Sequence, residues 1–337
     1  FGRRNNKGEF LTDFIYNGVV SGSEEGLFEV ERNGKHGHID INGKEIIPCM
    51  YDKGNYFSEG VASECLNGKW GMIDYFNNTV IPFEYENLYV SKNNIISAKK
   101  NGKYGLIDKG NNVVVDFLYD EIDCWNTREC NAYPVRIGDK WGLIDRYGNT
   151  FENIIYDDCQ LISDNEDNAG EFIILLKDDK KAIYSTKKQG FITDFIYDFV
   201  SFLSGNRFAV HKDNKRGFID TNGEIVTPII YESAHDECFS EDVCVVTQND
   251  KDGLIDLSGN LIVPCKYKRL HSCKNGLILA TDSDGNNGYI NNKGQIIIPF
   301  GKYTSFSDFS CGLAKVCREE FGNVYIDKTG KILEIEV

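Results

Sequence analysis

One short phrase recurs along this chain and divides it into many similar segments. The phrase reads Gly-Lys-aromatic-Gly-x-Ile-Asp-x-x-Gly, followed by an apolar run, a proline and a tyrosine, and clear copies occupy residues 34–52, 68–86, 102–120 and 139–157. A segment of this size is too small to bury a core of its own, so the copies must stack on one another. The sequence therefore predicts a repeat protein rather than one large globular domain.

The copies can be aligned on the residue that follows the aromatic residue, called the anchor from here on. The anchors are Gly2, Gly37, Gly71, Gly105, Gly142, Ala182, Gly217, Gly253, Gly288 and Val324. Their spacing of 34 to 40 residues is typical of solenoids, propellers and arrays. We therefore expect a single array over residues 1–337, with units near 1–35, 36–69, 70–103, 104–140, 141–180, 181–215, 216–251, 252–286 and 287–322 and a terminal half-repeat at 323–337.

Tyrosine and proline keep fixed distances from the anchor. A tyrosine follows each of the first nine anchors by fourteen or fifteen residues, namely Tyr16, Tyr51, Tyr85, Tyr119, Tyr156, Tyr197, Tyr231, Tyr267 and Tyr303. Five of the six prolines follow by eleven, namely Pro48, Pro82, Pro228, Pro264 and Pro299. We expect the tyrosine rings to pack between neighbouring units with their hydroxyls bonded to backbone. We expect each proline to mark a strand end or bend, because it cannot donate to a ladder.

An aspartate follows most anchors by three residues, and a glycine usually follows the aspartate by three more. The aspartates are Asp40, Asp74, Asp108, Asp145, Asp220, Asp256 and Asp327, and all but Asp74 and Asp108 have the glycine. This sequence between apolar runs is typical of a β-hairpin, because aspartate accepts backbone amide hydrogens of the turn and glycine adopts a positive φ easily. We therefore interpret each aspartate as a turn cap.

The segments between the turns predict an all-β fold. Runs such as 45–47, 113–115 and 261–263 are short, rich in Ile and Val, and bounded by Asn, Gly or Pro. No run is long enough to show the apolar period of a helix. Each unit is predicted to be an antiparallel meander of about 36 residues with three strands, or four if the segment after the tyrosine also pairs.

The phrase resembles the bacterial WG repeat family, also called KWG repeats. Lys-Trp-Gly stands literally at residues 69–71 and 140–142, and the resemblance covers essentially all of the chain. Other copies place His36, Tyr104, Arg216 or Asp252 at the aromatic position. The resemblance implies a β-rich repeat with a binding role and supplies no catalytic residues.

The formal net charge of −15 limits the classes of partner. An acidic surface repels phosphate backbones, so nucleic acid is not expected as a partner. No run of 18 apolar residues is present, so membrane insertion is not expected either. The chain starts inside a repeat at Phe1, without a methionine, and we expect it to be part of a longer polypeptide.

The eleven cysteines do not suggest a disulfide framework, because their number is odd and the repeats already provide a core. Free thiols favour a cytoplasmic location, unless a signal has been removed. Three pairs share a C-x5-C spacing, but structural zinc sites use tighter knuckles. We therefore expect no metal and no cofactor. The pairs are Cys124 and Cys130, Cys238 and Cys244, and Cys311 and Cys317.

No recognisable catalytic motif occurs. The histidines, at positions 36, 38, 211, 235 and 271, show no spacing that meets a nucleophile or metal. His36 is expected to be a half-buried ring in place of tryptophan. The segment from Asp282 begins like a calcium loop, but Lys293 stands where the bidentate acid is required. A weak cation site there or near residues 164–171 is less favoured than solvated turns.

Two arrangements of such an array are possible. A propeller wraps the meanders around an axis, whereas an open superhelix stacks them along a line. The two ends of the chain carry the same hairpin instead of complementary strands, and nine units exceed the usual four to eight blades. These observations favour an open, twisted solenoid, with a β-propeller as the alternative.

The expected function is a non-enzymatic protein-binding or scaffolding module whose partner has a basic or neutral surface. The candidate partner-binding residues are the aromatic residues Trp70, Tyr104, Trp141 and Trp125. One alternative is an adhesion module that recognises a glycan or extended peptide through repeated aromatic rings or Tyr-Asp/Glu pairs. A second alternative is an enzyme with a site in the irregular segments near Cys124–Trp125 and Ser163–Gly170.

Overall fold

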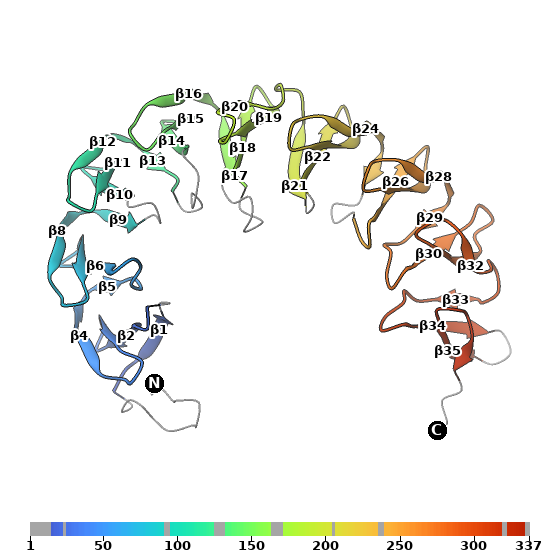
Figure 1. The fold of residues 1–337 in the computed structure, drawn as a ribbon, viewed down its shortest axis with the longest axis horizontal. Coiled ribbons are helices and arrows are strands. Elements are labelled where there is room, and N and C mark those ends of the chain that lie inside the picture. Colours follow the sequence, from blue (N-terminus) through green and yellow to red (C-terminus); the bar gives the residue numbers. More distant parts are fainter. Residues whose placement is uncertain are drawn as a thin grey trace. The chain divides into compact units, whose positions relative to one another are not determined.

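The computed structural model describes residues 15–22, 25–90, 95–124, 132–162, 171–203, 206–234, 239–318 and 322–333. The regular elements among these residues are all β-strands, and they form nine four-stranded sheets in which the strands follow one another in chain order (Figure 1). None of the nine sheets closes into a barrel. The predicted all-β tandem array of about nine meanders is therefore confirmed. No helix in the described part has the length and apolar character needed to cross a membrane.

The chain divides into two compact units, residues 1–177 with 184–190 and residues 178–183 with 191–337. The first four sheets lie in the first unit. Their strands are β1 (Gly18–Gly22), β2 (Phe28–Arg32), β3 (Lys35–Ile39) and β4 (Glu45–Tyr51); β5 (Lys53–Gly54), β6 (Val61–Leu66), β7 (Lys69–Asp74) and β8 (Thr79–Tyr85); β9 (Asn87–Val90), β10 (Ile95–Lys100), β11 (Lys103–Asp108) and β12 (Val113–Tyr119); and β13 (Glu121–Ile122), β14 (Tyr133–Ile137), β15 (Lys140–Ile144) and β16 (Thr150–Tyr156).

The fifth sheet comprises β17 (Asp158–Leu161), β18 (Phe172–Lys177), β19 (Lys180–Ser185) and β20 (Gly190–Phe191). The last four sheets lie in the second unit. Their strands are β21 (Phe199–Leu203), β22 (Arg207–Lys212), β23 (Lys215–Asp220) and β24 (Ile225–Tyr231); β25 (Ser233–Ala234), β26 (Val243–Gln248), β27 (Lys251–Asp256) and β28 (Leu261–Tyr267); β29 (Arg269–Leu270), β30 (Leu277–Thr281), β31 (Asn287–Asn291) and β32 (Ile296–Ile298); and β33 (Ser305–Phe306), β34 (Leu313–Arg318), β35 (Gly322–Asp327) and β36 (Ile332–Leu333).

Each sheet has four strands because the segment after the tyrosine does pair. Asp52 donates its amide hydrogen to the carbonyl of Cys65 at 2.7 Å, and Lys53 lies opposite Cys65 in the ladder between β5 and β6. Each sheet thus combines the second half of one sequence unit with the first half of the next. The hairpin predicted around Gly2 lies outside the described residues.

The aspartates that follow the anchors by three residues form the predicted turns between the third and fourth strands. Asp40 accepts the amide hydrogens of Asn42 and Lys44 at 2.8 and 2.9 Å, and Gly43 has a φ of 83°. Seven aspartates make this pair of contacts, so the interpretation as turn caps is confirmed. The other six are Asp74, Asp108, Asp145, Asp220, Asp256 and Asp327.

The prediction that proline ends a strand is wrong in four of five copies. Pro48 lies in the middle of β4, and Pro82, Pro228 and Pro264 lie equally deep in β8, β24 and β28. The fourth strand is an edge strand, and its register with the third strand shifts beside the anchor. Proline is tolerated because an edge and a bulge both remove the need for a ladder donor. Only Pro299 follows a strand end, that of β32.

The same irregularity explains the anchor glycine. A Cβ atom on Gly71 would lie 2.7 Å from the carbonyl oxygen of Ile81 and 2.9 Å from the ring of Phe83. Comparable close approaches occur at Gly37, Gly105, Gly142, Gly217, Gly253 and Gly288. The fourth strand therefore crosses the third at a distance that only glycine permits without displacement.

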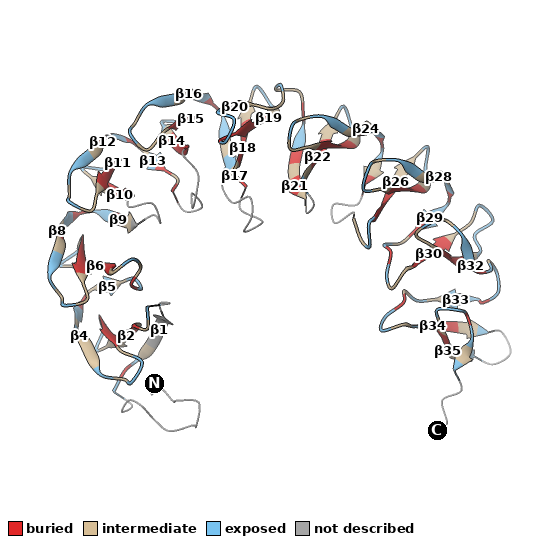
Figure 2. Ribbon diagram, in the orientation of Figure 1, coloured by how far each residue is buried: buried red, intermediate tan, exposed pale blue. Residues whose placement is uncertain are grey.

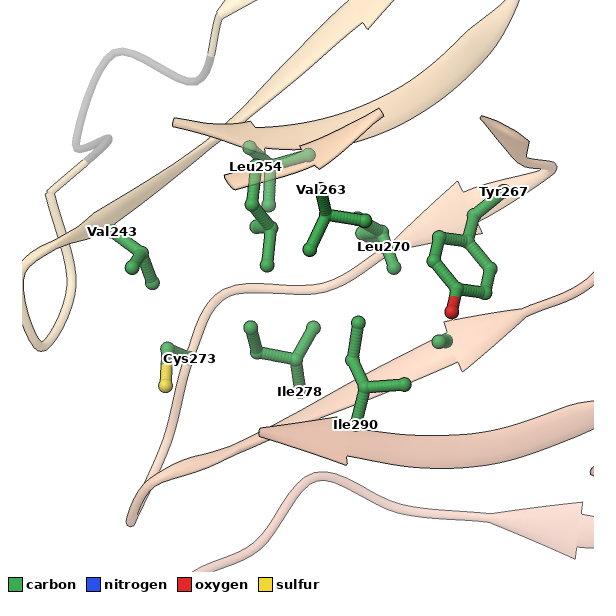
Figure 3. Close-up of a cluster of buried hydrophobic side chains, with 10 residues drawn as sticks. Val243, Leu254, Val263, Tyr267, Leu270, Cys273, Ile278 and Ile290 are labelled. Carbon is green, nitrogen blue, oxygen red and sulfur yellow. The ribbon is translucent and has the colours of Figure 1, made fainter. Parts of the chain in front are cut away.

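The core consists of apolar clusters between consecutive sheets within a unit, which we call joints. To each joint, the earlier sheet contributes three side chains: the residue after the anchor, the residue before the proline position, and the tyrosine. The later sheet contributes side chains of its second strand and the second residue after its own anchor. Figure 3 shows the joint between the seventh and eighth sheets, where Leu254, Val263 and Tyr267 face Leu270, Ile278 and Ile290. Internal sheets are thus buried on both faces.

In sheets whose fourth strand has seven residues, that strand is the most exposed of the four. In β8, β12, β24 and β28 the pattern of burial is identical, with the tyrosine and the residue before the proline position buried and three positions exposed. Figure 2 shows exposed stretches along β8 and β16, whereas β6 is largely buried. The repeated surface of the molecule is therefore carried by these outer strands.

Candidate functional site

The nine tyrosines form joints and do not present a binding ladder. All nine are buried, as predicted. Their hydroxyls differ from the expected backbone bonding: Tyr51 and Tyr85 donate at 2.6 Å to the side-chain oxygens of Asn77 and Asn111 in the next turn. Burial raises the pKa of Tyr85 above its ordinary value. A glycan or peptide therefore cannot use these rings as a repeated platform.

The acids after the tyrosines tie each sheet to the next. Asp120 accepts a hydrogen bond from Lys103 at 2.5 Å in its own sheet and from the amide of Gly138 at 2.8 Å in the following hairpin. These hydrogen bonds hold the pKa of Asp120 below its ordinary value. The lysine side chain is 40% exposed, so solvent weakens its ion pair with Asp120. Equivalent lysine and acid pairs are Lys35–Asp52, Lys140–Asp157, Lys180–Asp198 and Lys215–Glu232.

Three predicted partner-binding residues occupy equivalent places on consecutive sheets of the first unit. Trp70, Tyr104 and Trp141 lie on β7, β11 and β15, and each is half-buried. Trp70 and Tyr104 pack against the joints that contain Leu88 and Ile122 of the next sheets. One side of the Trp70 ring and one side of the Tyr104 ring thus support the stack. Trp125 lies outside the described residues.

Polar residues at the same position of the second unit make internal hydrogen bonds. Arg216 donates to the carbonyl of Ala234 at 2.9 Å, and Asp252 accepts the amide hydrogen of Leu270 at 2.8 Å. Each contact reaches the first strand of the next sheet. The aromatic position therefore supports the neighbouring sheet in both units, whatever its side chain.

Exposed apolar side chains recur on the fourth strands, at the first residue of the strand and at the residue before the tyrosine. We call this set the outer-strand surface: Met50, Val113, Leu118 and Ile155 in the first unit and Ile225, Ile230, Leu261 and Ile296 in the second. Their exposed fractions lie between 41% and 64%. Sequence reasoning did not select these residues, although their fixed distance from the anchor was a usable signal.

The joint between the first and second sheets contains titratable side chains where other joints contain apolar ones. His38 Nε2 lies 2.7 Å from Glu64 Oε1, and both side chains are fully buried. His36 Nδ1 lies 2.6 Å from Glu29 Oε1, and Glu29 is also buried. The prediction that His36 is half-buried is confirmed, with one fifth of its side chain exposed. The spacing of the histidines in the sequence indicated no partner for His38, and the structure pairs it with Glu64 of the next sheet.

Burial shifts both members of the inner pair toward their neutral forms. Desolvation lowers the pKa of His38 from 6.5 to about 4 and raises the pKa of Glu64 from 4.5 to about 9. The nearby Glu29 carboxylate acts on both groups, opposing the shift of His38 and adding to that of Glu64. Between these values the pair is neutral overall and holds one shared proton.

The cysteines form no disulfide within the described ranges, where nine are free. Cys130 and Cys238, each one member of a C-x5-C pair, lie outside those ranges, and the third pair, Cys311 and Cys317, consists of two free thiols. No cluster of three His, Cys, Asp or Glu side chains with metal-binding geometry occurs among the described residues. The carboxylate of Asp282 accepts the amide hydrogens of Asp284 and Asn286, which is a turn cap. The insertion at 163–170 and His235 are not described.

Comparison with known proteins identifies one family. A model of the WG containing repeat matches residues 37–70, 70–104, 104–141, 217–251, 253–282 and 288–320, which together exceed half of the chain. No curated protein matches the chain.

Several solved structures are weakly similar to the chain. A eukaryotic initiation factor matches at 14% identity and a TM-score of 0.38, over 91% of this chain and 94% of the other. The computationally designed Ika8 protein matches at 12% identity and 0.29, over 82% and 93%. BamB from Moraxella catarrhalis matches at 10% identity and 0.30, over 94% and 98%.

Proposed function

The chain belongs to the family of proteins built from WG-containing repeats, and from this membership and its geometry we propose that it is a non-enzymatic module that binds or scaffolds another protein. The observation that carries the proposal is the outer-strand surface. Apolar side chains exposed at the same positions of successive sheets suit an extended protein surface or segment. The turn aspartates and buried tyrosines are used within the chain and are not available to a ligand.

The net charge of −15 supports a partner with a basic or neutral surface. Electrostatic attraction would speed association and would weaken as salt increases. The exposed sides of Trp70, Tyr104 and Trp141 add candidate contacts in the first unit. Each of these rings can contribute a rigid apolar surface, as aromatic residues commonly do at interfaces.

A random peptide library selected on the immobilised chain tests the proposal. We expect the recovered peptides to combine Lys or Arg with apolar residues, and their synthetic forms to bind more weakly in high salt than in low salt. A variant with Met50→Ser, Leu118→Ser and Ile155→Ser, all in the first unit, should bind about tenfold more weakly or worse, because truncating central interface residues has that effect. The control is Phe76→Ser, which removes an 84% exposed ring from a hairpin turn.

Two results would contradict the proposal. One is a selection that recovers no peptide. The other is a recovered peptide whose affinity is equal for the native chain and the triple serine variant. Enrichment of peptides without basic residues, bound equally at both salt concentrations, would contradict the electrostatic part alone.

A further inference from the structure

The first joint departs from every comparable joint at several positions at once. The residue after the anchor is His38 here, and its equivalents Met72, Leu106, Leu254 and Tyr289 are apolar and fully buried. The residue opposite the next anchor is Glu64 here, and its equivalents in other sheets are Ala98, Val135, Val210, Val246, Ala280 and Val316. A buried acid and base in place of two apolar residues is generally not a stabilising exchange.

The geometry of the His38–Glu64 pair makes the stability of the joint depend on the protonation of the two side chains. His38 and Glu64 bond to each other across the two sheets, but His38 Nδ1 and Glu64 Oε2 are buried without a hydrogen-bond partner. Gly54 lies against Glu64, where a Cβ atom would come within 2.6 Å of Oε2, and the ring of Phe57 packs edge-on against His38. Neither side chain can therefore turn to water while the sheets are docked.

We propose that the first joint is a proton-operated switch, in which the docked sheets require one proton shared between His38 and Glu64, and loss of that proton undocks β3 from β6. Without it, Glu64 would be a buried carboxylate beside a neutral imidazole. A buried charge without a counter-charge is costly, and opening the joint to water relieves that cost.

The surrounding groups reinforce the requirement for a neutral pair. Glu29 on β2 lies directly opposite His38 in the ladder and is bonded to His36 on β3. Tyr51 on β4 and Cys65 on β6 are the other titratable groups that interact electrostatically with Glu64. Desolvation raises the pKa of both groups, so neither supplies a charge near neutral pH. The lysines nearest in sequence also have access to solvent: the Lys35 side chain is 44% exposed, and Lys53 is exposed.

The direction of the pH dependence follows from the protons held in each state. The docked pair keeps one proton from about pH 4 to about pH 9, because the pKa of His38 is lowered to about 4 and that of Glu64 is raised to about 9. In the open joint, with the ordinary values of 4.5 and 6.5, the pair holds one proton up to about 6.5 and none above. Opening thus releases a proton between about pH 6.5 and 9. The opening constant should rise about tenfold per pH unit in that window.

Hydrogen exchange of the full chain, followed by mass spectrometry at several pH values, measures this opening. After correction for the intrinsic pH dependence of exchange, we expect peptides from β3 and β6 to lose protection about tenfold per pH unit above 6.5. Peptides from β11 and β14, whose joint contains Leu106 and Val135, are the internal control and should show no such slope.

Two variants separate the switch from general instability. Glu64→Gln keeps the shape and a donor toward His38 Nε2 but cannot lose a proton, so the slope above pH 6.5 should vanish even if the joint is weaker throughout. The double variant His38→Met with Glu64→Ala installs the residues of the next joint, Met72 and Ala98, and should also remove the slope. Equal slopes in the native protein and the Glu64→Gln variant, or equal slopes in the first joint and the control joint, would overturn the proposal.

Discussion

The anchor glycine shows how one missing atom determines the course of two strands. In the third strand of each well-formed sheet, glycine lets the bulged fourth strand approach closely enough for its carbonyl to occupy the space of a Cβ. Alanine replaces it in the fifth sheet, where the fourth strand β20 has only two residues. The glycine is therefore required where a full-length fourth strand passes over it.

Gly71→Ala should destabilise the protein by about 1–3 kcal/mol, because the new methyl group must displace backbone and the ring of Phe83. Urea denaturation measures the change. Gly18→Ala is the matched control, since a Cβ atom there meets nothing within 4 Å, and we expect a change within about 0.5 kcal/mol. Equal effects of the two substitutions would refute the close-approach explanation.

Asp120, the acidic residue that follows Tyr119, is expected to make the stability of the fold decrease at low pH. Hydrogen bonds from Lys103 and the amide of Gly138 lower the pKa of Asp120 below its ordinary value of 3.8. The carboxylate therefore makes its full contribution to the free energy of unfolding above pH 3.8, and this contribution is lost as the pH falls below that value. Asp120→Asn should lower the thermal midpoint at neutral pH, and the difference from the native chain should close in acid. Asp116→Asn on the exposed side of β12 is the control and should have little effect at either pH. A difference for Asp120→Asn that persists unchanged in acid would contradict this assignment.

Joints combine the same kinds of residue but differ in their polar contacts. The hydroxyl of Tyr85 reaches Asn111, which occupies the glycine position of the next turn with a φ of 63°. The equivalent position in the joint of Tyr267 is Gly294, which has no side chain to accept a bond. The tyrosine ring is thus common to all joints, whereas the hydroxyl is used in only some.

Tyr85→Phe should therefore cost about 0.5–1.5 kcal/mol, the net value of a lost hydrogen bond, and Tyr267→Phe should be nearly neutral. Both substitutions keep the buried ring, so packing is not a variable. Paired denaturation experiments on the two variants measure the difference. If Tyr267→Phe cost as much as Tyr85→Phe, the bond to Asn111 would not be the cause.

The sequence was sufficient for the turns, the buried tyrosines and the repeated sheet, because Asp40, Gly43 and Tyr51 each serve a local contact that every copy must make. The prediction that Pro48 marks a strand end failed because an edge strand with a bulge accepts proline. Whether a strand lies at the edge depends on how the strands pair, which composition does not reveal. The fourth strand per sheet was left open for the same reason.

His38 and Glu64 escaped detection because they are 26 residues apart and meet only when two sheets dock. The sequence around His38 does not indicate which distant side chain will contact it in the fold. Comparing equivalent positions across the copies would have shown both as exceptions among apolar residues. The outer-strand surface was missed in a similar way, since exposed Leu118 and Ile230 look like core residues until the sheet face is known.

The buried apolar side chains of the described residues form a series of separate clusters, one at each joint. Each internal sheet is buried by its sequence neighbours within its unit, so stability is expected to be a sum of sheet and joint contributions. The ninth sheet illustrates the dependence: Tyr325 is 41% exposed, whereas the equivalent Tyr289 in the eighth sheet is fully buried against the ninth. Among the described residues no joint covers this face of the ninth sheet, and the face is exposed at Tyr325.

Hydrogen exchange on a chain shortened by residues 305–337 tests this stacked organisation. We predict that β30 and β31 of the eighth sheet lose protection, because the shared cluster of Leu279, Tyr289 and Val316 is broken, while strands such as β11 and β23 exchange as in the full chain. Protection lost together in all sheets, including the first, would contradict the account and would indicate one cooperative core or a closed ring.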